Sequence, residues 1–203
     1  MRSGHSAPKA ALRRWVLVGC ILLSAPVLAA PVALRSGPQV GERPLPFTSN
    51  AVTGPYRGKQ HCYVCELKDT PAVLVFARRM DDGSARLLRE LRDAVRDHRK
   101  EKLFAWVVFL GGENTPSETA LERQAYDFVR ENNATSLPVC ALGDPQGPPG
   151  YFIAPEADAT VIMFRNGKVV SNRAYRAKDW GSRAAANALK DLPKLLQSGS
   201  ASP

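Results

Sequence analysis

The sequence predicts an α/β fold: a central mixed sheet, built from parallel βαβ units and closed by an antiparallel hairpin, with helices on both faces. Three observations carry this prediction. Residues 72–77 and 103–110 are continuous apolar runs, as expected of strands buried on both faces of a parallel sheet. Residues 85–101, between these runs, repeat apolar side chains at helical spacing. Near the end of the chain, Asn166-Gly167 separates two further apolar runs and predicts a tight hairpin.

The predicted elements follow in the order strand, helix, strand, helix, strand, hairpin, helix. Residues 31–57 are rich in Pro and Gly and predict an extended lead-in with at most a short hairpin. After the second strand, Thr115 and Glu118 form a T-x-x-E capping box with Pro116 at the first helical position, which predicts a helix start. The remaining elements are a third strand over residues 137–142, the hairpin over 161–170 and a last helix from about 180 to 192, which Pro193 interrupts.

Residues 1–30 have the organisation of a secretory signal peptide. A basic segment ends at Arg13-Arg14, residues 15–29 are apolar, and small residues suited to a signal peptidase close the segment. The apolar run is shorter than the about 20 residues that span a bilayer. We therefore expect an exported protein, periplasmic or extracellular, with no transmembrane segment after signal removal. Leu17-Val18-Gly19 before Cys20 also resembles a lipobox, so lipid anchoring through Cys20 is the alternative.

The composition is that of one globular domain. Among 203 residues, 44% are hydrophobic and 23% are charged, enough for a core. We expect this domain over residues 58–197, after the lead-in at 31–57 and before a disordered tail at 198–203. The formal charge of +9 includes four basic residues of the leader, and the remaining mildly basic chain predicts no nucleic-acid partner. No Walker A, G-x-S-x-G or H-E-x-x-H motif is present, and we expect no cofactor.

Cys62 and Cys65 form a C-x-x-C pair just before the first predicted strand. Such a pair next to a βαβ pattern is typical of a thioredoxin-like thiol–disulfide site, and export provides a compartment in which disulfides persist. One interpretation is a redox dithiol, in which one thiolate attacks a partner disulfide and the other resolves the mixed disulfide. The alternative is a structural disulfide that holds the lead-in loop of a redox-inert interaction domain.

His61 permits a third interpretation, a zinc or Cu(I) site formed by His61, Cys62 and Cys65. Zinc sites usually have two ligand pairs, and the chain offers one. Cys140, in the third predicted strand, is expected to be a small buried apolar side chain, or a resolving cysteine if the fold brings it near the pair. His98 is expected to cap or pack its helix, and the arginines of that helix to form a solvated face of mixed charge.

The order of elements resembles the thioredoxin-like superfamily, in the branch of the peroxiredoxins and the TlpA/ResA-type exported thiol oxidoreductases. The resemblance covers about residues 40–196. Val40-Gly41-Glu42 with Pro46-Phe47 is similar to the family's opening segment, residues 72–77 to the strand that delivers the active site, and residues 159–170 to the terminal hairpin. With the C-x-x-C motif, the resemblance leads us to expect a thiol–disulfide oxidoreductase with Cys62 and Cys65 as catalytic residues and protein thiols and disulfides as partners.

The chain departs from this family at two positions. In the family the nucleophilic cysteine follows the first strand, where the N-terminus of the next helix stabilises the thiolate. Here residues 78–84 contain no cysteine, and Asp81 and Asp82 would raise the pKa of a thiol placed there. The family's cis-proline corresponds to Ala159, where we expect a trans bond because a non-proline cis bond costs about 2.5–4 kcal/mol.

Overall fold

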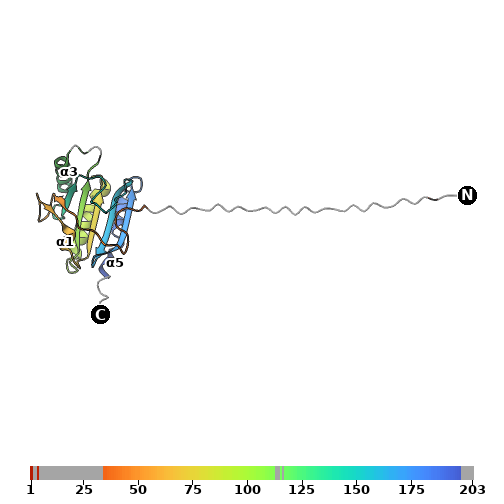
Figure 1. The fold of residues 1–203 in the computed structure, drawn as a ribbon, viewed down its shortest axis with the longest axis horizontal. Coiled ribbons are helices and arrows are strands. Elements are labelled where there is room, and N and C mark those ends of the chain that lie inside the picture. Colours follow the sequence, from red (N-terminus) through yellow and green to blue (C-terminus); the bar gives the residue numbers. More distant parts are fainter. Residues whose placement is uncertain (2–3, 5–33, 113–114, 116, 198–203) are drawn as a thin grey trace. The chain divides into compact units, whose positions relative to one another are not determined.

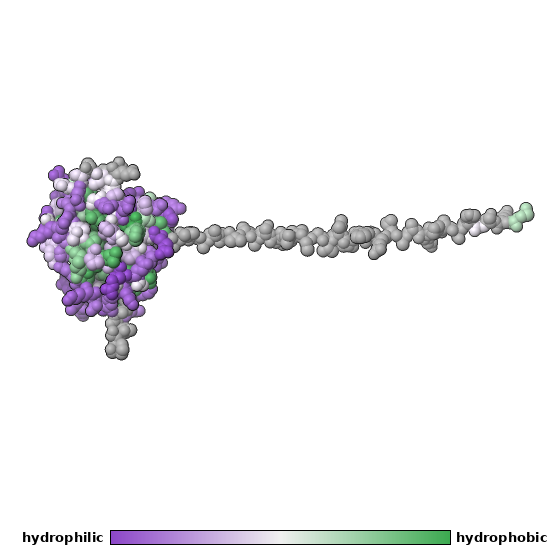
Figure 2. Space-filling view, viewed as in Figure 1, coloured by the Kyte–Doolittle hydropathy of each residue, from purple (hydrophilic) through white to green (hydrophobic). Residues whose placement is uncertain are grey.

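The computed structural model describes residues 1, 4, 34–112, 115 and 117–197. Apart from residues 1 and 4, the predicted signal peptide at 1–30 lies outside the described residues, as do Cys20 and the predicted tail at 198–203. Within the described ranges, no helix is long and apolar enough to cross a bilayer. The face drawn in Figure 2 mixes hydrophilic side chains with smaller apolar areas.

A seven-stranded sheet with the order β2-β1-β5-β4-β3-β6-β7 forms the centre of the fold. Figure 1 shows the strands side by side, from the orange β1–β2 hairpin to the blue β6–β7 hairpin. The strands are β1 (Ser49–Ala51), β2 (Gln60–His61), β3 (Ala72–Ala77), β4 (Phe104–Leu110), β5 (Val139–Leu142), β6 (Ala157–Arg165) and β7 (Lys168–Arg176). Neighbours β3, β4 and β5 are parallel, and all other pairs are antiparallel. The predicted mixed sheet is confirmed.

The helices are divided unequally between the two faces of the sheet. They are α1 (Tyr63–Glu66), α2 (Asp82–Asp97), α3 (Glu118–Glu131), α4 (Ser182–Ala188) and α5 (Leu192–Gln197). Helices α2 to α5 pack on one face, whereas α1 and irregular segments cover the other. The crossovers β3–α2–β4 and β4–α3–β5 advance in the same direction across the sheet, and right-handed crossovers then place both helices on one face.

Strands β3 and β4 supply both cores, as their continuous apolar sequence predicts. They pair in register from Ala72 with Phe104 to Ala77 with Phe109. Alternate side chains point to opposite faces, so Val73 and Val75 enter the helix-covered core while Leu74 enters the other. This second core is the one that α1 covers.

Two predicted helix features were wrong. The N-cap of α3 is Ser117, whose hydroxyl accepts the N–H of Ala120, and not Thr115. The Thr115 hydroxyl instead accepts the N–H of Gly112 in a local turn, a competing bond that side-chain hydroxyls readily form. The predicted last helix is two short helices, and Pro193 lies in the first turn of α5, where a missing N–H costs no intrahelical bond.

The terminal hairpin is confirmed and is longer than predicted. Strands β6 and β7 have nine residues each, and Asn166 (φ +52°) and Gly167 (φ +67°) form the turn between them. Positive φ at both central residues is the signature of the hairpin turns that Asn-Gly favours. The peptide bond at Ala159 is trans, as are all peptide bonds of the described residues.

Candidate functional site

Cys62 and Cys65 form a disulfide at the start of α1, with their Cα atoms 5.5 Å apart. Cys62 is the N-cap of this helix in an extended conformation, and its Sγ accepts the N–H of Cys65 at 3.3 Å. Cys65 is exposed and Cys62 is half-buried. The sequence did not predict a helix at this pair, so α1 is a correction: the cysteines do lie at a helix start, though not at the one the family uses.

Two apolar side chains anchor α1 on the sheet. Tyr63 and Leu67 are buried, and their spacing of four residues places them on one side of a helical turn. The ring of Tyr63 lies 5.3 Å from that of Phe104 and 5.9 Å from that of Trp106. Because this side of α1 faces the core, Cys65 is left on the solvent side.

His61 and Tyr56 form an aromatic pair beside the disulfide. Their rings are stacked, with centroids 3.4 Å apart and planes 11° apart. Glu66 links these two rings to α1. Its carboxylate lies 3.2 Å from Nε2 of His61 and accepts a hydrogen bond from the Tyr56 hydroxyl at 2.8 Å. That hydrogen bond raises the pKa of Tyr56. Any positive charge on His61 is thus balanced by Glu66.

Cys140 is a free, fully buried thiol in β5, beneath the same face of the sheet. Burial raises its pKa to about 11, and a hydrogen bond with Ser49 offsets part of this effect. The thiol is therefore protonated at neutral pH and packs as an apolar side chain, in line with the first of its two predicted roles.

The β3–α2 junction, where the family carries its nucleophile, is a structural network of polar contacts. Arg78 donates to the carbonyl oxygens of Pro145, Ala154 and Ala157, which anchors the loop before β6. Asp81 caps α2 by accepting the N–H of Ser84. No side chain here can exchange disulfides.

The C-x-x-C pair and the β3–α2 junction cannot form a single site. The junction follows the end of β3, whereas Tyr63 contacts Phe104, which pairs with Ala72 at the start of β3. Six strand residues between these levels correspond to about 20 Å. In addition, α1 and α2 cover opposite faces of the sheet.

The residues proposed for a metal site do not form one in this structure. Among the described residues, no three His, Cys, Asp or Glu side chains are grouped so that they could hold a metal ion. Cys62 and Cys65 are bonded to each other, and metal binding requires free thiolates. His61, the third predicted ligand, is engaged with Tyr56 and Glu66.

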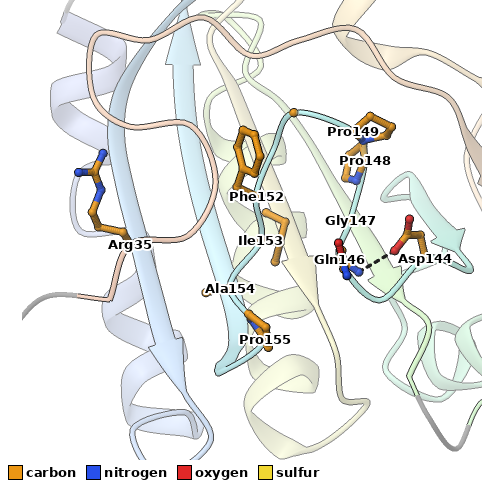
Figure 3. A pocket seen from close by; sticks show the side chains of 11 residues that line it. Arg35, Asp144, Gln146, Gly147, Pro148, Pro149, Phe152, Ile153, Ala154 and Pro155 are labelled. Atoms are coloured by element: carbon orange, nitrogen blue, oxygen red, sulfur yellow. Dashed lines mark hydrogen bonds between the residues drawn. The ribbon is translucent and has the colours of Figure 1, made fainter.

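A large hollow of about 570 Å³ lies away from the cysteines, along residues 144–155 and beside Arg35 (Figure 3). Phe152 at its rim is 84% exposed and has φ +53°. The N–H of Gln146 donates to Asp144 within the loop. Neither Cys nor His lines this hollow, so it offers no thiol chemistry.

Sequence reasoning missed the cluster of Tyr56, Tyr63 and Glu66 around the pair. The signal for α1 was present, because Tyr63 and Leu67 have helical spacing after a residue able to cap. The stacking of Tyr56 on His61 left no such signal, since it depends on the β1–β2 hairpin.

Comparisons with known proteins reveal likeness in structure alone. No family model matches the sequence, and no curated protein does. A protein from Bacteroides thetaiotaomicron, described as a protein disulfide isomerase, is 14% identical with a TM-score of 0.58, over 82% of this chain and 97% of that one. A Chlorobium tepidum protein, described as thiol:disulfide interchange protein DsbE, is 14% identical with a TM-score of 0.55, over 78% and 98%.

A third similar structure is the peroxidoxin BcpB from Mycobacterium tuberculosis. It is 16% identical with a TM-score of 0.53, over 79% of this chain and 97% of that one. The peroxidoxin and the DsbE protein fall in the two branches that the order of elements resembles. Sequence identities of 14–16% support a statement about the fold alone. The chain has the thioredoxin-like fold, with its C-x-x-C disulfide placed before the first core strand.

Proposed function

We propose that the chain is an exported thioredoxin-fold protein whose Cys62–Cys65 pair exchanges electrons with protein thiols and disulfides. The position of the disulfide carries the proposal: it lies on the exposed side of a four-residue helix and closes a loop of three residue steps. Loop-closure entropy at that length is worth only about 2 kcal/mol. The bridge joins no distant segments, so its accessibility to partner thiols is a better account of it than a structural clamp.

The two sulfurs have different roles in this proposal. A substrate thiolate attacks the exposed Sγ of Cys65, the S–S bond breaks, and Cys62 leaves with the electron pair as a thiolate. Its Sγ already accepts the N–H of Cys65, and this hydrogen bond favours the charged form. A second substrate thiolate then attacks the substrate sulfur of the mixed disulfide and releases the Cys65 thiolate. The substrate gains a disulfide, the pair gains two electrons, and the reverse sequence reduces a substrate disulfide.

Trapping of mixed disulfides tests this assignment. Cys62→Ser keeps the exposed Cys65 and removes the sulfur that resolves the mixed disulfide. We expect it to accumulate about tenfold more mixed disulfide with a peptide disulfide than Cys65→Ser does, as quantified by mass spectrometry. Better trapping by Cys65→Ser would reverse the roles of the two sulfurs. If neither variant forms a mixed disulfide, the proposed function is wrong.

Export rests on the signal-like sequence at 1–30 and is tested on the mature protein. We expect the intact mass of the protein purified from its native cells to lack about the first 30 residues. A mass that places a lipidated Cys20 at the N-terminus would support the anchored alternative. An intact leader would contradict both.

A redox-inert interaction domain is the second candidate. The carboxylate of Glu66, 3.2 Å from Nε2 of His61, favours it, because an acid beside the imidazole leaves no net positive charge from these two groups to stabilise a thiolate at Cys62. A reduction potential of the pair below about −300 mV would support this candidate, whereas values near those of thioredoxin or protein disulfide isomerase support exchange. Stoichiometric zinc or Cu(I) binding by the reduced protein, lost in His61→Ala, would instead support the metal-handling interpretation.

A further inference from the structure

Two adjoining hollows form a groove at the C-terminal end of α2. They share Arg92, Val95 and Ser136 in their linings and have volumes of about 460 and 230 Å³. Arg96, Arg99 and Lys102 line the larger hollow. Pro55, Phe104 and Leu137 line the smaller one. We call the pair the α2 groove, with a basic mouth and a largely apolar floor.

Part of the positive charge of the mouth is balanced within α2. Arg92 and Arg96 both contact the carboxylate of Asp93, at 3.0 and 3.1 Å. Arg96 also contacts Asp97 at 2.9 Å. These pairs match the mixed-charge face predicted for this helix, and by themselves they would leave the groove nearly neutral.

Arg99 and Lys102 leave the mouth with net positive charge. Both are exposed, and within the described part of the chain neither side chain makes an ion pair or a hydrogen bond. Lys102 has φ +58°, a conformation in which glycine would cost less. Its N–H bonds to the carbonyl of Arg99 at 3.1 Å, so one tight turn holds both cations at the groove. No acidic residue lines either hollow.

The floor of the groove leads toward the disulfide. Phe104 lines the floor, and its ring lies 5.3 Å from that of Tyr63, which stands between the two cysteines in sequence. Pro55, also in the floor, directly precedes Tyr56, which stacks on His61. Through these contacts the floor adjoins residues that neighbour the C-x-x-C pair.

We propose that the α2 groove docks an acidic segment of the partner protein whose thiols or disulfide react at Cys62–Cys65. This inference rests on the proposed function and names its substrate class. Carboxylates would pair with Arg99 and Lys102, and an apolar side chain would cover the floor beside Phe104. A small inorganic anion would use the mouth alone and leave the apolar floor unexplained. A nucleic acid would need a longer uncompensated track than α2 offers, since Arg86 pairs with Glu90.

A cysteine-free fluorescent peptide, with four glutamates around one leucine, tests docking on the oxidised full chain. By fluorescence anisotropy we expect it to bind at least tenfold more tightly than its glutamine counterpart. This difference in affinity should be smaller at 500 mM salt than at 50 mM, because salt screens exposed charges. Arg99→Glu with Lys102→Glu should weaken binding at least tenfold. The control, Lys178→Glu with Arg183→Glu, reverses two exposed charges near Trp180, which packs at the start of α2, and should stay within twofold of wild type.

Equal binding of the two peptides, or binding unchanged by the charge reversal in the groove, would overturn the inference. Lys102→Gly removes one cation without a backbone penalty, so a folded variant is available even if the double reversal fails to fold.

The exchange rate with an uncharged small disulfide separates docking from chemistry. If docking alone fails, that rate stays measurable and the charge of the peptide has no effect. If the proposed function fails, the peptide still binds but no disulfide reacts.

Discussion

The C-x-x-C pair on α1 and the β3–α2 junction differ in exposure and in how they are held. The pair consists of an exposed Cys65 and a half-buried Cys62, spans three residue steps and is anchored through Tyr63 and Leu67. The junction is bound by hydrogen bonds from Arg78 to three carbonyl groups and by the cap at Asp81. The supporting polar network and the site of the proposed exchange therefore occupy separate places in this fold: the junction anchors the loop before β6, while the disulfide presents an exposed cysteine.

Arg78 should have the largest effect on stability. Burial lowers the pKa of its guanidinium, and Arg78→Met would leave three carbonyl groups without their charged donor. Hydrogen bonds from charged groups contribute about 1.5–3 kcal/mol each, and their contributions are not additive. We therefore expect the free energy of unfolding, measured by urea denaturation, to fall by about 3 kcal/mol. The rate of thiol exchange at Cys62–Cys65 should stay within twofold.

Arg86→Met is the matched control for this prediction. Arg86 forms an exposed pair with Glu90 four residues along α2, and such pairs contribute about 0.3–0.5 kcal/mol. A loss of similar size in both variants would show that Arg78 does not anchor the loop before β6. A collapse of thiol exchange in Arg78→Met would show that the two regions act together.

Removing the disulfide should have a smaller effect. The loop closed by Cys62 and Cys65 is so short that its loss lowers the free energy of unfolding by about 2 kcal/mol in the chain-entropy account. We expect this decrease in a Cys62→Ser/Cys65→Ser variant, and no further change in that variant on adding a reductant. A loss of 4 kcal/mol or more would favour a structural bridge over an exchanger.

The sequence was sufficient to predict the sheet and insufficient to predict the helix that carries the C-x-x-C pair. Continuous apolar runs and the Asn-Gly turn determine the sheet, because burial on both faces leaves little freedom for Ala72–Ala77. A helix as short as α1 offers only one pair of apolar residues at helical spacing, Tyr63 and Leu67, and its geometry depends on Tyr63 meeting Phe104 from a distant strand. The α2 groove likewise joins residues separated in sequence, such as Pro55 and Lys102.

Replacing Cys140 should have the smallest effect. The experiment tests whether the site of the proposed exchange extends from the C-x-x-C pair into the core. Burial raises its pKa to about 11, against about 8.5 for an unfolded thiol. The folded chain therefore holds this proton more tightly. The resulting stability is complete below about pH 8.5 and is lost as the pH rises toward 11.

In a Cys62→Ser/Cys65→Ser background, which prevents disulfide exchange, we expect the stability advantage of Cys140 over Cys140→Ala to shrink by about 1 kcal/mol between pH 7.5 and pH 9.5. Urea unfolding of the two proteins at each pH measures it, and ionisation of the buried Tyr63 and Tyr151 cancels in the comparison. An advantage independent of pH, together with rapid alkylation of Cys140 in the folded protein, would mean that solvent reaches this thiol beneath α1. Cys140 could then take part in exchange with Cys62 and Cys65, and the site of the proposed exchange would extend from the surface into the core.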